Sequence, residues 1–162
     1  MKSNAQMIAQ EQDNPMTQWV TFSLEEETYG INVMQVQEVL KLPEIAPVPG
    51  SPDYVIGIIN LRGNVVTVVD TRSRFGLPAR EPDDATRIVI IEANRQVVGM
   101  LVDSVAEVVE LNAVHIETAP TVGNDESSKY IQGVYSREDK LVILVDLNKF
   151  LSEEEWGEVG GI

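Results

Sequence analysis

The chain has 162 residues, with 26 aspartates and glutamates against 12 lysines and arginines, and no cysteine. This length suits one domain, or two small lobes that share a core. The net charge of −14 argues against nucleic acid or an anionic membrane surface as a partner, because both need a cationic contact surface. Without cysteine there are no disulfides, thiolate metal sites or cysteine nucleophiles.

Residues 1–16 are polar and rich in glutamine and asparagine, which predicts a disordered tail before an ordered domain over residues 17–152. The tail lacks the continuous apolar core of a signal peptide, and no apolar run approaches membrane-spanning length. We therefore expect a cytoplasmic protein.

The ordered part begins with two expected strands joined by a charged turn. Residues 19–24 alternate, with Val20, Phe22 and Leu24 on one side, which predicts a strand with one buried face. Residues 29–33 return as the second strand of this hairpin. Residues 34–42 fit both helical and strand periodicity, so we expect a helical turn that leads into a strand. Four prolines over residues 43–52 then predict an extended loop.

Residues 54–70 contain two β-branched apolar runs, 55–59 and 65–69, which predict a tight hairpin. Between the runs, Gly63 and Asn64 tolerate the positive φ of a turn. Arg62 beside them is a cation with no carboxylate nearby in sequence. It either solvates the turn or pairs with a distant acid, or it contacts an acidic or polar partner. Asp70 is the expected N-cap of a short helix that ends at Gly76.

The second half repeats this plan, with apolar runs at residues 88–91, 97–102, 105–111, 130–135 and 141–145. The separation from Gly30 to Val39 equals that from Gly99 to Val108, and Gly57 to Asp70 matches Gly133 to Asp146. These equal spacings predict an internal duplication. We expect a mainly β fold of two small five-stranded barrels with short helices, sharing a core and enclosing a groove between them. We place lobe one at about residues 17–84 and lobe two at about 85–152, with strands open to exchange.

The last residues, 153–162, form an acidic segment whose role is open. Ser152 and Glu155 have the spacing of a capping box, which predicts that a helix opens there.

Three aspartates that end apolar runs are the strongest candidates for catalysis or metal binding: Asp70, Asp103 and Asp146. They could form a carboxylate pair for acid–base chemistry or an oxygen-ligand metal site. The favoured alternative is that they cap the turn or helix that follows. His115 is the only histidine and has no neighbours at ligand spacing, so we expect no metal and no cofactor. A small aspartate-dependent hydrolase stays the rival hypothesis to a recognition protein.

Recognition is the better-supported class, and the candidates lie in the first half. If residues 34–42 are extended, Val36 and Glu38 share a face that could receive an amphipathic partner helix. The alternative is that Val36 is a core residue.

These residues resemble a known family. Tyr29-Gly-Ile-Asn-Val, Val36-Gln-Glu-Val, Gly57-Ile-Ile-Asn-Leu-Arg-Gly63 and Val98-Gly-Met-Leu-Val-Asp103 together are similar to CheW, the bacterial chemotaxis coupling proteins. The resemblance covers roughly residues 17–152. It implies two intertwined SH3-like five-stranded β-barrels and a non-enzymatic scaffold that couples chemoreceptor cytoplasmic helices to a CheA-type histidine kinase, without direct membrane contact. An adaptor of a non-chemotaxis signalling array is the alternative.

The resemblance also implies roles for individual residues. Val36, Glu38 and Arg62 match positions linked to receptor contact or signalling. Gly57 and Asn60 lie in the same motif and are assigned to kinase binding or signalling. Val108 is a groove residue by its position in the repeat. Related modules occur in CheA and CheV, whereas here we expect a stand-alone module.

Overall fold

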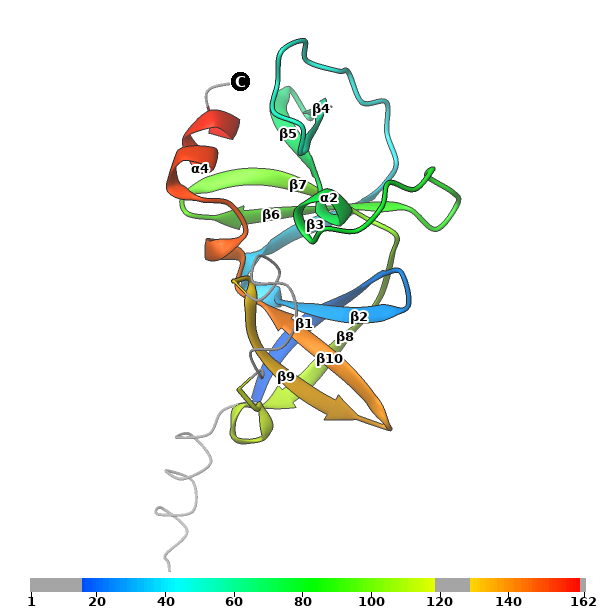
Figure 1. The fold of residues 1–162 in the computed structure, drawn as a ribbon, viewed down its shortest axis with the longest axis vertical. Helices are drawn as coiled ribbons and strands as arrows, with labels where there is room; N and C mark the ends of the chain where they lie inside the picture. The colour runs from blue at the N-terminus through cyan, green and yellow to red at the C-terminus, as the bar shows by residue number, and fades with distance from the viewer. Residues whose placement is uncertain (1–15, 119–128, 161–162) are drawn as a thin grey trace, which may run out of the picture.

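The computed structural model describes residues 16–118 and 129–160, which fold into two five-stranded sheets with short helices (Figure 1). Sheet A has the strand order β8-β1-β2-β10-β9. Its strands are β1 (Met16–Leu24), β2 (Glu27–Asn32), β8 (Ser104–Asn112), β9 (Ile131–Arg137) and β10 (Lys140–Val145). Sheet B has the order β3-β6-β7-β5-β4. Its strands are β3 (Val36–Lys41), β4 (Val55–Leu61), β5 (Asn64–Asp70), β6 (Arg87–Ala93) and β7 (Gln96–Val102).

The two sheets repeat one topology, which confirms the predicted pair of SH3-like five-stranded units. Each contains a single parallel pair, β10 with β2 in sheet A and β5 with β7 in sheet B. The hydrogen-bond ladder does not close either barrel, a difference from the prediction. Isolated bridges, Ala46 with Ile58 and Glu117 with Val134, link the edge strands β4 and β9 to the segments that precede them.

The sheets do not divide at residue 84, because strands are exchanged between the halves, as the prediction had left open. Sheet B is continuous in sequence, from β3 to β7, whereas sheet A joins the β1–β2 hairpin to strands β8, β9 and β10. Each sheet therefore combines a hairpin from one repeat with three strands from the other. The physical reason is that β1 and β6 each find their second neighbour in the other repeat, β8 and β3 respectively.

Five short helices complete the described fold: η1 (Val33–Gln35), α2 (Thr71–Arg74), η2 (Ala113–His115), η3 (Leu147–Lys149) and α4 (Glu153–Gly160). The predicted helical turn before the strand of residues 36–41 is η1. The predicted N-cap at Asp70 is confirmed, because its side chain accepts a hydrogen bond from the Arg72 amide. Ser152 and Glu155 form the predicted capping box at the start of α4, each side chain accepting the other's amide. No described helix is long and apolar enough to cross a membrane.

Apolar side chains gather in three clusters. A large cluster lies between the sheets, and each sheet encloses a smaller one of its own. Strand β1 faces two of them, since Phe22 packs in the shared cluster and Trp19 in that of sheet A. The prediction of one buried face was therefore wrong: Trp19 is 3% exposed and Thr21 2% exposed. Sheet A is covered on both sides at β1 because it encloses its own cluster on one side and packs against sheet B on the other.

The β6–β7 turn provides a stability prediction. Arg95 is exposed, has a φ of 64° and has no hydrogen bond or ion pair among the described contacts. A left-handed conformation strains every residue with a Cβ except in a few favourable cases. We expect Arg95→Gly to raise the free energy of unfolding by about 0.5–1 kcal/mol, measured by urea denaturation. A lower midpoint than in the natural chain would contradict this interpretation.

Candidate binding surface

Arg62 stands at the tip of the predicted β4–β5 hairpin, in a turn of the I′ type. Arg62 and Gly63 have φ values of 51° and 87°. The sequence had suggested Gly63 and Asn64 for the positive φ, but Asn64 already belongs to β5 and pairs with Leu61. Asn60 stabilises the turn, because its side-chain oxygen accepts the Gly63 amide at 2.8 Å. An arginine occupies a position that favours asparagine or glycine, and such strain is a common feature of functional sites.

Arg62 has an ion-pair partner on the opposite edge strand of sheet B. Its Nη1 lies 3.1 Å from each of the two carboxylate oxygens of Glu38 on β3. The Arg62 side chain is nevertheless 71% exposed, against 26% for Glu38. The structure therefore brings these two predicted residues together. It leaves most of the guanidinium surface open to a partner, and an ion pair this exposed contributes little to stability.

Val36 and Glu38 lie on opposite faces of sheet B, contrary to the prediction that they share one. A β-bulge interrupts the pairing of β3 with β6, so that Val36 is opposite Ile91 and Glu38 is opposite Ile90. Ile91 packs in the shared cluster and Ile90 in the cluster of sheet B. The extra residue, Gln37, moves Glu38 to the other face.

The repeat places a matching set of valines on β8. Val36 and Val39 of β3 correspond to Val105 and Val108 of β8 by their spacing from Gly30 and Gly99. Val108 is opposite Val20 and Val105 is opposite Phe22, two residues of the shared cluster. We call these four residues the valine surface: Val36, Val39, Val105 and Val108. Val39 and Val108 are exposed, whereas Val36 and Val105 are half-buried against the shared cluster.

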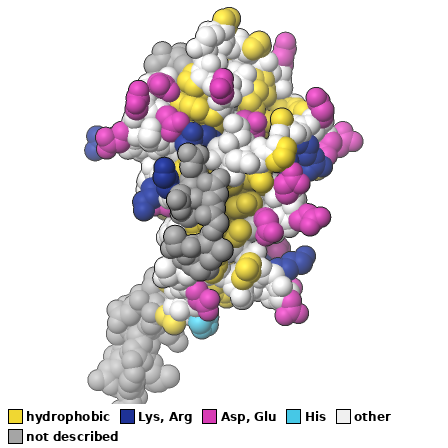
Figure 2. Space-filling model, viewed as in Figure 1, with side chains coloured by type: hydrophobic (Ala, Val, Ile, Leu, Met, Phe, Trp, Pro, Cys, Tyr) yellow, Lys and Arg dark blue, Asp and Glu magenta, His cyan; other side chains and the backbone are white. Residues whose placement is uncertain are grey.

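The valine surface is formed by edge strands of both sheets, and its half-buried members Val36 and Val105 pack against the cluster between the sheets. Sequence reasoning identified Val36 and Val108 but missed Val39 and Val105 as contact residues. The equal glycine–valine spacings contained the signal for both. Figure 2 shows acidic side chains spread around the margins of the face in view, with hydrophobic side chains between them, in line with the net charge.

Gly57 has a structural role that requires glycine. It is buried in β4, and a Cβ there would lie 2.3 Å from the carbonyl oxygen of Ala46. At the equivalent position, a Cβ on Gly133 would lie 2.8 Å from the Glu117 carbonyl oxygen. Both glycines allow the preceding segment to bridge to the edge strand. Gly57 thus offers no side chain to a partner, and its effect on binding would act through the shape of the β4–β5 hairpin.

The close approach at Gly57 gives a second prediction. We expect Gly57→Ala to lower the free energy of unfolding by about 2–3 kcal/mol, because the backbone of residue 46 must move. Gly157 in α4 is the matched control, since a Cβ there meets nothing within 4 Å. Gly157→Ala should instead stabilise the chain by about 0.5–1 kcal/mol. Chemical denaturation of both variants checks the pair, and equal midpoints would contradict the assignment.

The strand-end aspartates do not form a catalytic pair. Asp70 and Asp146 each cap the helix that follows, accepting the amides of Arg72 and Asn148. Asp103 instead belongs to an ion-pair cluster with arginines. No group of three possible metal ligands occurs among the described residues, and His115 lies exposed at the end of η2.

That ion-pair cluster joins the β1–β2 turn of sheet A to helix α2, which follows β5 of sheet B. The Arg72 guanidinium, whose side chain is 7% exposed, donates to Asp103 at 2.6 Å, to Glu25 of the β1–β2 turn, and to the Pro78 carbonyl at 2.8 Å. Asp103 also accepts the Glu25 amide at 2.9 Å and a bond from Arg80 at 3.1 Å. Burial acts to lower the pKa of Arg72, but the two carboxylates outweigh it and raise that pKa. The sequence did not single out Arg72.

Comparisons with known proteins agree with the fold and with the motifs. The family model for the CheW-like domain matches residues 18–155. The chain belongs to the CheW-like domain family. It is 32% identical over 145 residues to the chemotaxis protein CheW of Klebsiella aerogenes, covering 90% of this chain and 87% of that protein. It is 35% identical over 135 residues to CheW of Bacillus subtilis, covering 83% and 86%.

The CheW-like fold is also found in a solved relative. The crystal structure of the scaffolding protein CheW from Thermoanaerobacter tengcongensis superposes with a TM-score of 0.78 and 35% sequence identity. The match covers 84% of this chain and 92% of that one. CheW-like proteins are non-enzymatic adaptors, so membership of the family favours recognition over the hydrolase hypothesis.

Proposed function

We propose that this chain is a cytoplasmic scaffold that couples the cytoplasmic helices of chemoreceptors to a CheA-type histidine kinase in chemotaxis signalling. The observation that carries the proposal is the match of the CheW-like family over residues 18–155, nearly all of the described chain. Relatives that share about a third of its sequence are chemotaxis coupling proteins. The mechanism is contact geometry, with no bond made or broken.

The receptor helix would contact the valine surface. An amphipathic helix presents apolar side chains at spacings of three and four residues, and exposed valines on two edge strands offer anchors for them. Val39 and Val108, at 41% and 55% exposure, supply most of the accessible apolar area among the four valines. Burial of such anchors would provide most of the affinity.

Arg62 and Glu38 would provide specificity at the hairpin tip. The exposed guanidinium can leave Glu38 for a polar or acidic group of the receptor or kinase, or it can contact both groups at once. Asn60 and Gly57 would act through this residue, because the first closes the turn and the second lets β4 lie close to residue 46. A mutation at any of these sites would alter signalling by moving Arg62.

The test separates the function of Arg62 from its effect on folding. Arg62→Asn removes the cation but suits the left-handed turn, so the midpoint of thermal unfolding should stay equal or rise. Receptor-dependent activation of the kinase, measured as phosphorylation in reconstituted complexes with receptor-containing membranes, should fall by about tenfold or more. Kinase activation by the Arg62→Glu variant should fall at least as far.

The matched control is Arg95, another exposed arginine with positive φ in a hairpin turn of sheet B. Arg95→Asn and Arg95→Glu should leave kinase activation within about twofold of the natural chain. Full activation by Arg62→Asn would show that the role given to Arg62 is wrong. A chain that binds neither receptor nor kinase would overturn the proposed function itself.

A further inference from the structure

The internal repeat relates two sets of residues on the inner faces of the sheets. Tyr54 and Tyr130 are equivalent, because their carbonyl oxygens accept the amides of Asp70 and Asp146 at the same distance, 2.8 Å. The parallel pairs share one register, with Thr67 opposite Val98 in sheet B and Ile143 opposite Tyr29 in sheet A. The full sets are Tyr54, Val55, Thr67, Val69 and Val98, and Tyr130, Ile131, Ile143, Val145 and Tyr29.

In sheet B this set is covered by helix α4. Trp156 and Val159 are 1% and 5% exposed and pack in the shared cluster with Tyr54, Val69 and Val98. Polar contacts fix the helix from both sides. The Thr67 hydroxyl donates to the Val159 carbonyl at 3.2 Å, and the Tyr54 hydroxyl donates to the Glu158 carboxylate at 2.9 Å.

In sheet A the equivalent set lines a pocket of about 260 Å³. We call it the interlobe pocket, and its walls are Tyr29, Phe75, Leu77, Tyr130, Ile131, Ile143 and Val145. Phe75 follows α2 as Phe150 follows η3, and its ring stacks on Tyr130 with centroids 5.6 Å apart. After Leu77 the chain continues as a loop to residue 86 and forms no helix. The first repeat therefore lacks a helix equivalent to α4, which at the end of the second repeat covers the matching set in sheet B.

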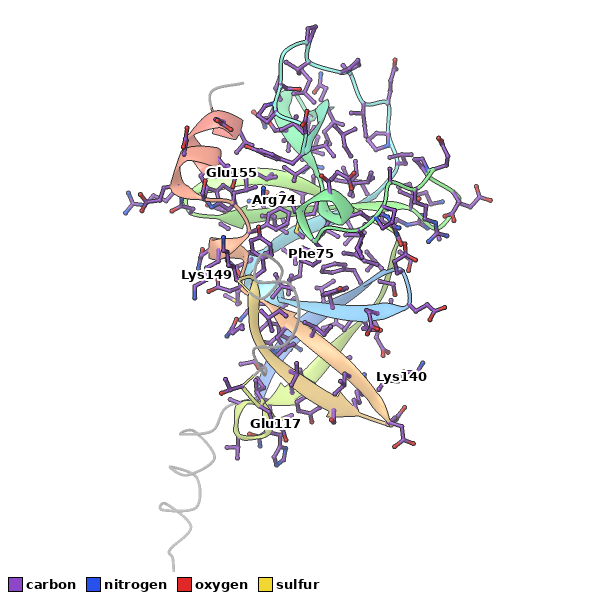
Figure 3. The ribbon with its side chains drawn as sticks, in the orientation of Figure 1. Arg74, Phe75, Glu117, Lys140, Lys149 and Glu155 are labelled. Atoms are coloured by element: carbon purple, nitrogen blue, oxygen red, sulfur yellow. The ribbon has the colours of Figure 1, made fainter. Side chains whose placement is uncertain are left out.

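Two cations, Arg74 and Lys129, precede the wall residues Phe75 and Tyr130 in the sequence. The Arg74 guanidinium lies between the two equivalent tyrosines, 5.1 Å from the Tyr54 ring centre and 5.6 Å from that of Tyr130. On the α4 side it binds Glu155 through two hydrogen bonds of 2.7 and 3.1 Å, and Figure 3 shows the two residues together. Lys129 precedes the wall residue Tyr130 and lines a separate shallow cleft with Lys149.

We propose that the interlobe pocket binds an acidic amphipathic helix of a partner protein, which inserts an aromatic and an aliphatic side chain three positions apart. This is the chemistry of Trp156 and Val159 with the glutamates around them, at the equivalent site. The pocket lies on β2, β9 and β10 and is distinct from the valine surface on β3 and β8. Helix α4 of a second copy is a poorer occupant, because its departure would expose Trp156 of its own core.

The probe is a synthetic peptide with the sequence of residues 152–160, cross-linked between exposed positions so that it is helical. It is titrated into the full chain, and binding is followed by NMR of backbone amides and methyl groups. We expect saturable shifts at Leu77, Ile131 and Ile143. The same peptide with alanine in place of tryptophan should bind at least about tenfold more weakly. The assay needs neither receptor nor kinase, so its failure would leave the proposed function intact.

Two variants of the chain decide the location. Leu77→Trp adds bulk from a half-buried wall residue and should abolish the saturable shifts, whereas Val65→Trp, at a position 65% exposed on β5, should not. Ile143→Thr copies Thr67 at the equivalent position, keeps the strand and should weaken binding severalfold. Absence of saturable shifts, shifts confined to the valine surface, or displacement of the chain's own α4 seen at Tyr54 and Thr67 would each overturn the proposal.

Discussion

Trp156→Ala is expected to lower the free energy of unfolding by about 3–5 kcal/mol, a large share of the stability of a domain this size. The side chain is 1% exposed and is the largest of the fully buried residues in the shared cluster. Its removal leaves a cavity between the lobes, and its indole also loses a 3.4 Å contact to the Asn148 carbonyl. Urea denaturation followed by circular dichroism measures the change without depending on tryptophan fluorescence.

The control for Trp156 is Glu154→Ala on the exposed side of the same helix, which should change stability by less than about 0.5 kcal/mol. A chain ending at Ser152 should be destabilised at least as much as Trp156→Ala. If that shortened chain unfolded at the natural midpoint, α4 would be an appendage and not part of the core. The sequence left the role of residues 153–162 open; in the structure, residues 153–160 form a helix that covers sheet B.

Arg72→Met is expected to lower the free energy of unfolding by about 2–4 kcal/mol. The substitution keeps most of the side-chain volume but leaves Asp103, whose side chain is 10% exposed, without its closest cation. Arg80 still contacts Asp103, and Glu25 is half exposed, so the loss is smaller than for a fully enclosed pair. Denaturation measures the stability, and residual dipolar couplings measure the relative orientation of the two sheets.

A double-mutant comparison tests whether Arg72 acts through Asp103. Arg72→Met combined with Asp103→Asn should cost clearly less than the sum of the single variants, because the more buried of the two carboxylates that Arg72 pairs with is no longer charged. Arg80→Ala is the matched control, since Arg80 is half exposed and should cost less than about 1 kcal/mol. Additive costs, with unchanged couplings in Arg72→Met, would contradict a role in joining the lobes.

Local features were predictable because they depend on nearby residues. The cap at Asp70, the capping box at Ser152 and the hairpin around Arg62 each require only a few neighbouring side chains. The duplication was also predictable, since equal glycine spacings survive in both halves. The pairing of strands was not, because an apolar strand pattern defines which face is buried and does not identify the neighbouring strand.

The candidate site could be predicted only in part, and for a definite reason. Arg62 and Glu38 were both named, but their 3.1 Å contact depends on the approach of β3 and β4, the two edge strands of sheet B. The bulge at Gln37 leaves no mark in the sequence, although it decides which face Glu38 occupies. Nothing in the sequence distinguishes Arg72 from the nearby Arg74. Only the folded position of the β1–β2 turn shows that Arg72 is the one that contacts Glu25.

The exchange of strands has a consequence for how the protein is made on the ribosome. Sheet B can assemble once β7 has left the exit tunnel, but the β1–β2 hairpin must wait until β8 and then β10 emerge. At typical rates of synthesis this delay is roughly two to nine seconds. During that time the hairpin exposes the edges that β8 and β10 will later cover. Slow codons or truncation before β10 should therefore favour nascent chains that associate through these edges.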